Sequence, residues 1–418
     1  MLPSLHKPIS PPPARPAGAA LSSLAALEAG KDTVTDPVQA ISTHLRKYTT
    51  RPQLMHLNQL NNLSIDAWKA LYSRHAHSHG HHFVIHQHDH PVAGLHYDLR
   101  LQCSDSSSLS WSIMYGLPGD PNSRRLTRNA TETRVHLLWN HLIETASAKT
   151  GSMLIWDTGE YEILPDKSNR SGRLNTGPET DESASDSDSD SRRDRSSELP
   201  ESEKLRSAFQ NHKIHLRLHG TRLPKNYTIF LSLDKSDRRC APTPESLSRT
   251  PRKRKRRRTI TNNQPSSTSN SESDSESDAG ISSGQTSGSG KRRKKDNNTE
   301  HSDADADAEG NSETDYQIRL HNAYPGADND IGSIHQRRWF LVLDRAGSGF
   351  VPENHSAGKR WVRGVDQQSR VTTGFDPFYV RGPEVERSVL TGRLGRDVLR
   401  DEGVEGFVPR RGWNAVLV

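Results

Sequence analysis

Residues 83–101 read FVIHQHDHPVAGLHYDLRL, and the end of this stretch decides the fold around it. Side chains of a β-strand alternate between its two faces. His96, Asp98 and Arg100 would therefore share one face. The residues between them would share the other: Tyr97, Leu99 and Leu101. We predict that the apolar face anchors the strand in a core. A neutral nitrogen ligand, a carboxylate and a fixed cation on the polar face suit a divalent metal ion beside a phosphate.

The composition predicts less folded mass than the 418 residues would allow. Hydrophobic residues make up 31% of the chain and aromatic residues 6%, which is low for a compact enzyme of this length. The 57 basic and 51 acidic residues almost balance, but they are sorted into blocks, as is typical of tails and linkers. We therefore expect much of the chain to be disordered.

The two cysteines, Cys103 and Cys240, rule out a disulfide framework and a cysteine-rich zinc finger. They favour a reducing compartment. The Pro-rich N-terminus lacks the apolar core of a signal peptide. No run approaches the roughly 18 apolar residues that a membrane span requires. These features predict a soluble intracellular protein without a membrane partner.

One β-rich domain interrupted by two inserts is the organisation that the sequence predicts. Neither insert has enough apolar residues to offset its ordering entropy. The expected parts are a mostly disordered arm (residues 1–61), the first part of the β domain (62–165) and an acidic insert (166–203). They are followed by the last strands of the domain (204–235), a linker rich in Ser/Asp and Lys/Arg (236–314) and an extension of strands plus a helix (315–418).

Apolar periodicity and turn residues predict the local elements. Helices are expected near Ser22–Glu28, after a cap at Ser64 or Asp66, over 134–146 and from Pro383 onward. Residues 153–156 and 161–164 are expected to form a hairpin around a turn at 157–159. The other strand candidates are residues 109–114, 214–218, 227–233, 316–320, 338–343 and 375–380.

His88, on the preceding segment, could be a third metal ligand if it lies beside the polar face that carries His96 and Asp98. Two histidines and a carboxylate suit Mn²⁺, Fe²⁺ or Zn²⁺ and leave positions open for substrate and water. Arg100 is then placed to bind a phosphate oxygen. No Ser or Cys lies in a nucleophile motif, which favours water as the attacking group. The dense histidines of residues 75–82 have a simpler interpretation, as a tract that binds metals without chemistry.

Several motifs in order resemble the 3′-phosphoesterase domain of bacterial DNA ligase D. In that family an F-V-x-x-x-H-D segment runs into L-H-Y-D-x-R-L, as in residues 83–101. The resemblance extends over roughly residues 83–233 and continues through Ser110-Trp111, Arg125-Leu126, residues 155–159 (IWDTG) and residues 218–223 (LHGTRL). It implies a mainly β fold, a compact β-barrel with a few flanking helices. It also implies Mn²⁺ as cofactor and removal of 3′-phosphates or 3′-terminal ribonucleotides from DNA ends, which leaves a 3′-hydroxyl.

By position, the resemblance assigns the metal ligands to His88, His96 and Asp98, and phosphate contacts to Arg100 and Arg125. The family's later catalytic histidine is best matched by His136, which a packed, hydrogen-bonded role would also explain. Tyr115 stands where the family has a lysine, and His86 where it has a glutamine, so we expect both in the substrate pocket. The departures from the family pattern therefore fall in the phosphate pocket rather than among the metal ligands. The accompanying ligase and polymerase domains are absent from this sequence.

Two basic runs, PRKRKRRR at 251–258 and KRRKK at 291–295, predict nuclear import and contact with nucleic-acid phosphates, against the simpler alternative of a solvated linker. Together these features predict a nuclear, Mn²⁺-dependent phosphoesterase. Its expected partners are DNA ends, with RNA-containing ends and repair proteins as further candidates. The rival prediction is a non-catalytic nucleic-acid-binding or scaffold protein that keeps the barrel.

Overall fold

The computed structural model describes Leu24, Leu27 and residues 34–49, 63–165, 199–237, 321–355, 358–365 and 370–417. The helices of this part are α2 (Pro37–Tyr48), α3 (Ile65–His75), the 3₁₀ helix η2 (Leu138–Leu142), α5 (Glu201–Gln210) and α7 (Gly395–Asp401). The strands are β1 (His82–His90), β2 (Gly94–Gln102), β3 (Ser107–Met114), β4 (Thr127–Glu132), β5 (His136–Leu137), β6 (Thr145–Ser147), β7 (Gly151–Ile163), β8 (Lys213–Gly220), β9 (Thr228–Leu233), β10 (Arg338–Leu343), β11 (Phe350–His355) and β12 (Gly358–Arg363).

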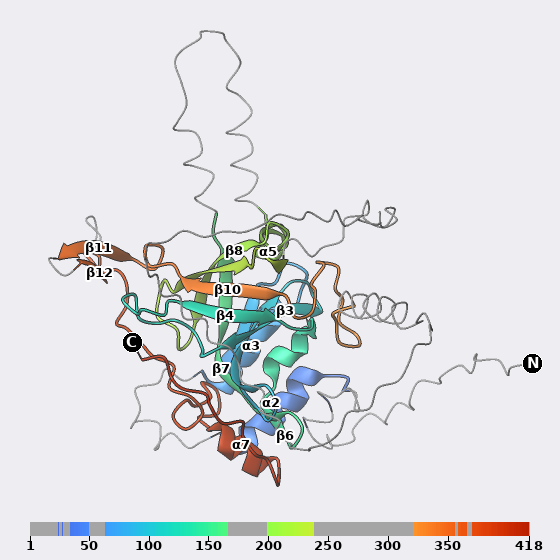
Figure 1. Cartoon of the computed structure of the whole chain (residues 1–418). Helices are drawn as coiled ribbons and strands as arrows, with labels where there is room; N and C mark the ends of the chain where they lie inside the picture. The colour runs from blue at the N-terminus through green and yellow to red at the C-terminus, as the bar shows by residue number, and fades with distance from the viewer. Residues whose placement is uncertain are drawn as a thin grey trace, which may run out of the picture. The chain divides into compact units, whose positions relative to one another are not determined.

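Eight antiparallel strands close into a barrel (Figure 1). The order runs from β1 through β2, β3, β4, β10, β9 and β8 to β7, and β7 pairs back with β1. β5 adds to β3 and β6 adds to β7, while β11 and β12 form a separate hairpin. The predicted mainly β fold with a compact barrel is therefore confirmed.

β10 joins this barrel from the part of the chain that we expected to be a C-terminal extension. The strand itself was predicted, but it pairs with β4 on one side and β9 on the other. Trp339 and Leu341 of β10 are fully buried in the barrel, and the Trp339 indole N–H donates to Glu132 at 2.8 Å. Residues 204–235, expected to hold the last barrel strands, thus complete the barrel only together with β10.

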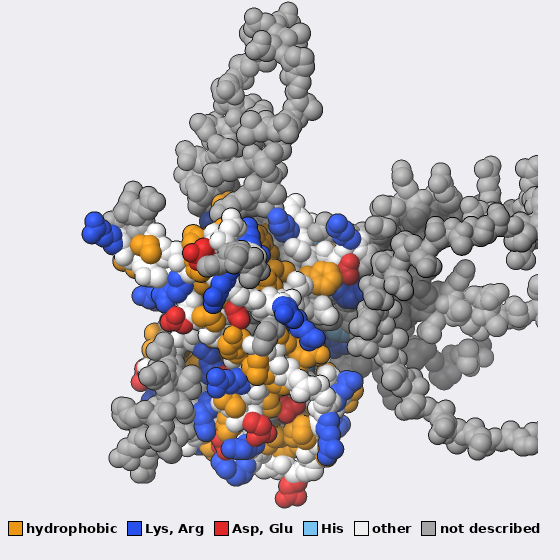
Figure 2. All heavy atoms as spheres, turned by 60° about the vertical axis from the view of Figure 1, so that its left-hand side comes forward, with side chains coloured by type: hydrophobic (Ala, Val, Ile, Leu, Met, Phe, Trp, Pro, Cys, Tyr) orange, Lys and Arg blue, Asp and Glu red, His pale blue; other side chains and the backbone are white. Residues whose placement is uncertain are grey.

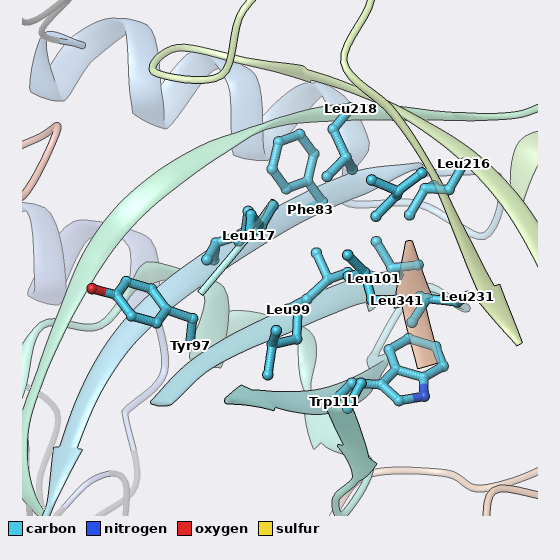
Figure 3. Close-up of a cluster of buried hydrophobic side chains, with 14 of the residues drawn as sticks. Phe83, Tyr97, Leu99, Leu101, Trp111, Leu117, Leu216, Leu218, Leu231 and Leu341 are labelled. Atoms are coloured by element: carbon cyan, nitrogen blue, oxygen red, sulfur yellow. The ribbon is translucent and has the colours of Figure 1, made fainter. Parts of the chain in front are cut away.

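Large apolar side chains from alternate strand positions fill the barrel (Figure 3). On β2 these are Tyr97, Leu99 and Leu101, all fully buried, with Leu95 beside them. Burial of one such side chain stabilises the fold by about 1.5–3 kcal/mol. The alternation predicted for the opening stretch is confirmed, and β1 and β2 form an antiparallel hairpin.

A second, smaller core lies on the outer side of the barrel, where α2, α3 and η2 pack against β1 and β7. Trp68 of α3 and Ile41 of α2 meet Val84 of β1 in this core. The predicted cap of α3 is present, because the Ser64 side chain accepts from the Ala67 N–H at 3.1 Å. The sequence prediction missed α2, which lies within the arm of residues 1–61 that we expected to be mostly disordered.

The hairpin predicted around residues 157–159 is instead one continuous strand, β7. The Asp157 carboxylate does not close a turn of its own. It accepts backbone N–H groups from Thr221, Arg222 and Leu223 at 2.8–2.9 Å. These bonds hold the loop after β8 against the middle of β7. Asp157, which suggested a turn in the sequence, therefore makes a tertiary contact instead.

The helix predicted from Pro383 is reduced to α7, and residues 375–380 do not form a strand. The Val389 N–H donates to the Ile155 carbonyl at 3.0 Å, and its carbonyl accepts from Leu63 at 2.9 Å. Tertiary partners therefore take the backbone groups that a helix would need. The strand predicted over 316–320 and, except for Leu24 and Leu27, the helix near Ser22–Glu28 lie outside the described residues.

The two expected inserts also lie outside the described residues, apart from their ends. α5 begins at Glu201, inside the stretch assigned to the first insert, and buries Leu205 and Phe209 against the barrel. In the described ranges, no helix has the length and apolar character needed to cross a membrane.

Candidate metal centre

A row of polar side chains runs along the outer face of β1, β2 and β3. In the register of these strands His88 lies opposite His96, and Asp98 lies between His86 of β1 and Ser112 of β3. The outer core covers part of this row, so Asp98 is only 5% exposed and His96 only 6%. The predicted polar face is therefore present, and it is largely shielded from water.

The three predicted metal ligands are brought together. Nδ1 of His88 lies 3.2 Å from Oδ2 of Asp98, and Nε2 of His96 lies 3.4 Å from Oδ1 of the same carboxylate. Each of the three residues offers one ligand atom, and these atoms lie within 4.8 Å of one another. Two imidazoles and a carboxylate on neighbouring strands are a donor set that divalent transition metals prefer.

In His88 and in His96, the ring nitrogen that does not face Asp98 is hydrogen-bonded, and its partner shows where the imidazole proton lies. Nε2 of His88 is 2.8 Å from the Thr150 carbonyl, and Nδ1 of His96 is 2.8 Å from the Gly94 carbonyl. A carbonyl oxygen only accepts, so these nitrogens carry the protons of the neutral rings. In these neutral tautomers the lone pairs of the other two nitrogens face Asp98, and either a proton, as in a His88–Asp98 hydrogen bond, or a metal cation removes their repulsion with the carboxylate. The donors therefore fit a metal ion, and the two carbonyls orient its ligands.

The local charges keep these ligands in the forms that a metal needs. Burial by itself would raise the pKa of Asp98, but the His96 and His88 rings in their protonated form, together with the Arg100 cation, outweigh burial and hold that pKa well below its usual value. Burial lowers the pKa of His96, although Asp98 opposes this effect. The carboxylate is therefore ionised and the His96 imidazole neutral at pH 7.

Arg100 lies beside this group and is almost completely buried, with few partners for its five donors. Nη2 lies 3.9 Å from Oδ2 of Asp98, and Nη1 donates to the Asn140 carbonyl at 3.3 Å. Nε has no hydrogen-bond partner among the described residues. A buried cation with unfilled donors costs free energy that a bound anion would offset. This position supports the role in phosphate binding predicted for Arg100.

The segment that carries His136 is not the predicted helix over 134–146. It forms β5, which pairs with β3, then η2 and β6. The Leu138 N–H donates to the Ser106 carbonyl at 2.7 Å, so the chain is bonded to its neighbour where a helix would bond to itself. The helical spacing of the apolar residues reflects instead the single 3₁₀ turn that packs on the outer core.

His136 lies close enough to the group around Asp98 for the charges of that group to act on it, and its ring proton is assigned to Nε2. Nδ2 of Asn140 is 3.1 Å from Nδ1 of His136, so in this amide orientation Nδ1 accepts and the ring proton lies on Nε2. Burial, followed by the charge of Arg100, holds the pKa of His136 well below its usual value. Asp98 is among the other charges that act on it. His136 is therefore a neutral hydrogen-bond donor at pH 7.

Of the three residues expected in the substrate pocket, the structure places only His86 beside Asp98. His86 is fully buried, and its Nε2 bonds the Ile143 carbonyl at 3.1 Å. Tyr115 follows β3 and lines a small hollow with Arg128, while Arg125 is exposed in the loop before β4. Neither Tyr115 nor Arg125 contacts the group around Asp98 by a hydrogen bond or ion pair in the described part of the chain. Their roles in substrate binding stay predictions.

An aromatic residue that the sequence did not suggest lies against His136. The ring of Tyr324, which is 37% exposed, has its centroid 4.6 Å from that of His136, and the Arg134 guanidinium is 5.5 Å from the Tyr324 centroid. The Tyr324 N–H donates to the Val135 carbonyl at 3.0 Å, and Val135 donates to Asn322 at 2.9 Å. No local signal marks Tyr324, because it comes from a distant part of the chain.

Comparison with known families gives one match over the segment that carries this site. Residues 86–231 match the family model described as the DNA ligase D 3′-phosphoesterase domain. The matched segment includes the three candidate metal ligands, Arg100 and His136, whereas Tyr324 and β10 lie beyond it. No curated protein matches the chain. The resemblance inferred from the motifs is therefore confirmed for this segment.

Proposed function

We propose, because residues 86–231 match the DNA ligase D 3′-phosphoesterase domain, that this chain is a metal-dependent hydrolase of phosphate esters at the 3′ ends of DNA. It removes a 3′-phosphate or a 3′-terminal ribonucleotide and leaves a 3′-hydroxyl. One observation carries the proposal. An imidazole nitrogen of His88 and one of His96 lie 3.2 and 3.4 Å from the Asp98 carboxylate oxygens, and a buried guanidinium with an unpartnered Nε lies beside them.

His88, His96 and Asp98 would hold the metal, which we propose to be Mn²⁺. When bound, the ion supplies charge neutralisation for the phosphate and activation of a water molecule. The carbonyls of Thr150 and Gly94 keep both imidazoles turned towards the ion. Such outer contacts usually matter for metal affinity nearly as much as the ligands do.

Arg100 binds a non-bridging phosphate oxygen, since its position beside Asp98 sets a cation next to the metal group. His136 donates its Nε2–H to the departing 3′-oxygen and so stabilises the charge that develops there. Asn140 acts as a positioning residue for both, because its side chain contacts the His136 ring and its carbonyl accepts from Arg100.

A nucleic acid, rather than a small phosphate ester, is the proposed substrate. Tyr324 and Arg134 form an exposed aromatic and basic pair beside His136, and such pairs stack nucleobases in proteins that bind single-stranded ends. Figure 2 shows lysine and arginine side chains spread across one face of the described part of the chain, with fewer acidic ones between them. This distribution favours the approach of a polyanion.

A nuclear location is also part of the proposal. It rests on the basic runs at 251–258 and 291–295, which lie outside the described residues. A fluorescent fusion should leave the nucleus when both runs are replaced by neutral residues. An unchanged nuclear signal would refute this part.

The test is an end-healing assay on the purified full chain. A 5′-labelled DNA primer–template with a 3′-phosphate, or with one 3′-terminal ribonucleotide, is incubated with Mn²⁺ or with EDTA. We expect Mn²⁺-dependent conversion to a 3′-hydroxyl. The His96→Ala variant should lose the conversion, and the matched His77→Ala variant, which removes an exposed histidine from the same region, should keep it.

The opposite outcome is equally informative. A folded protein that binds Mn²⁺ and DNA but converts neither substrate would overturn the enzymatic proposal. It would favour the non-catalytic nucleic-acid-binding protein that the sequence left as the alternative.

A further inference from the structure

A second group of metal-ligating side chains lies between α3, β1 and β7. His75 ends α3, His81 directly precedes β1, and Glu160 lies on β7. Each offers one ligand atom, and these atoms lie within 4.8 Å of one another. Nε2 of His75 is 2.9 Å from Oε1 of Glu160, and the His75 and His81 ring centroids are 4.4 Å apart. The group is therefore assembled by the tertiary fold from three different elements.

The turn that carries His75 and His81 is held in place by the fully buried Gln102. The Gln102 side chain donates to three backbone carbonyls and accepts one backbone N–H at 2.7–3.2 Å, those of His75, His77, Ser104 and His82. Gly80 is needed in the same turn, because a Cβ there would lie 2.1 Å from the His75 carbonyl oxygen. The histidine backbone is thus ordered before any ion binds, which lowers the cost of collecting the ligands.

The existing contacts of the three side chains show what an ion would replace. Nδ1 of His75 accepts the His81 backbone N–H at 3.3 Å, so the ring proton lies on Nε2 and points to Glu160, and a divalent cation would take the place of that proton. Arg74 contacts the same Glu160 oxygen at 2.5 Å, but the Arg74 side chain is 63% exposed. An ion pair exposed to that degree contributes little, so a divalent cation would displace Arg74 into solvent.

We propose that His75, His81 and Glu160 form a second metal site, which takes Zn²⁺ and fastens the end of α3 to β1 and β7. Two imidazole nitrogens and one carboxylate oxygen are typical Zn²⁺ ligands, and water fills the fourth position. The donor types are the same as those around Asp98, where Mn²⁺ is proposed from the family match; sites of such ligands in general bind Zn²⁺ more tightly than Mn²⁺. Because His75 and Glu160 are 85 positions apart, the ion would close a long loop and stabilise the folded chain. This site does not depend on the proposed phosphoesterase activity.

The experiment uses the untagged full chain, stripped with a chelator, in the His96→Ala background so that the centre around Asp98 does not contribute. Zn²⁺ is titrated by calorimetry, and the thermal midpoint is measured with and without the ion. We expect one tight Zn²⁺ per chain and a rise in the midpoint. Adding His81→Ala or Glu160→Gln should lower the Zn²⁺ affinity by about 100-fold or more and remove the rise.

A matched control separates a defined site from a histidine-rich tract. His77 and His79 are exposed on the same turn, so His77→Ala/His79→Ala should leave the tight Zn²⁺ in place. Co²⁺ offers a readout of geometry, since the intense visible bands of a tetrahedral ion should vanish in the His81→Ala and Glu160→Gln variants and persist in the His77→Ala/His79→Ala variant. The proposal is overturned if His81→Ala and Glu160→Gln bind Zn²⁺ like their parent, or if the His77/His79 variant loses as much affinity as they do.

Discussion

The two faces of β2 share one backbone and differ in almost every other respect. Leu99 points into the barrel among apolar side chains, whereas Asp98 and Arg100 point outward into a layer of imidazoles and helices. Both faces are buried, but burial stabilises the inner face and disfavours the charges on the outer one. A strand can thus assign stability and chemistry to alternate residues, and substitutions on one face should leave the other face's role intact.

Asp98→Ala should have the largest effect on catalysis. It removes the ligand that both imidazoles face, so turnover of a 3′-phosphate primer should fall by about 10³-fold or more. The inner face keeps its contacts, and thermal unfolding should stay cooperative. Single-turnover rates and calorimetric Mn²⁺ binding measure the loss. A variant that keeps full activity would refute the metal centre.

Leu99→Ala changes the neighbouring residue and should affect stability instead. A fully buried leucine in a packed core costs about 2–5 kcal/mol of unfolding free energy when truncated. Urea unfolding measures that cost, while kcat measured well below the unfolding midpoint should be unchanged. A large fall in kcat without a loss of stability would mean that the two faces are not independent.

His136→Ala tests how far the chemistry extends beyond the strand. Without the Nε2–H donor, kcat should fall by about 10²-fold while Mn²⁺ affinity stays the same. His136→Gln, which restores an N–H donor, should recover part of the rate. If both variants match the unchanged chain, His136 is only the packed, hydrogen-bonded residue that the sequence left as an alternative.

Tyr324→Ala should change recognition and leave the chemistry intact. Loss of a stacking ring should raise KM for a DNA primer by about fivefold or more, with kcat and the hydrolysis of 4-nitrophenyl phosphate unchanged. Tyr324→Phe keeps the ring and serves as the matched control. An equal loss on both substrates would show that Tyr324 supports His136 rather than the nucleic acid.

The smallest expected effect is the pH dependence of metal binding. Because burial lowers the pKa of His96, protons compete with the metal only at a lower pH than for an ordinary histidine. The neutral form of His96 therefore persists as the pH falls from 8 to 6, so protonation of His96 should not weaken Mn²⁺ binding in this range. An NMR titration of the His96 ring in the metal-free chain measures this, and a midpoint at or above pH 6.5 would contradict this environment.

Local patterns predicted the strands better than the helices. The alternation in β2, the strand at 338–343 and the Ser64 cap depend on neighbours in sequence, and all three are confirmed. The helices expected over 134–146 and from Pro383 fail, because backbone groups there bond to Ser106, Leu63 and Ile155. Apolar spacing cannot separate a helix from a segment whose hydrogen bonds go to distant strands.

Residue order alone places His96, Asp98 and Arg100 on one face, because strand alternation is a property of the backbone. It also suggests His88, which the hairpin register sets opposite His96. Three arrangements could be read only from the folded chain: this face lies outside the barrel, β10 completes the ring, and Tyr324 contacts His136. These arrangements follow from packing and hydrogen bonds between segments far apart in the chain, for which no local pattern exists.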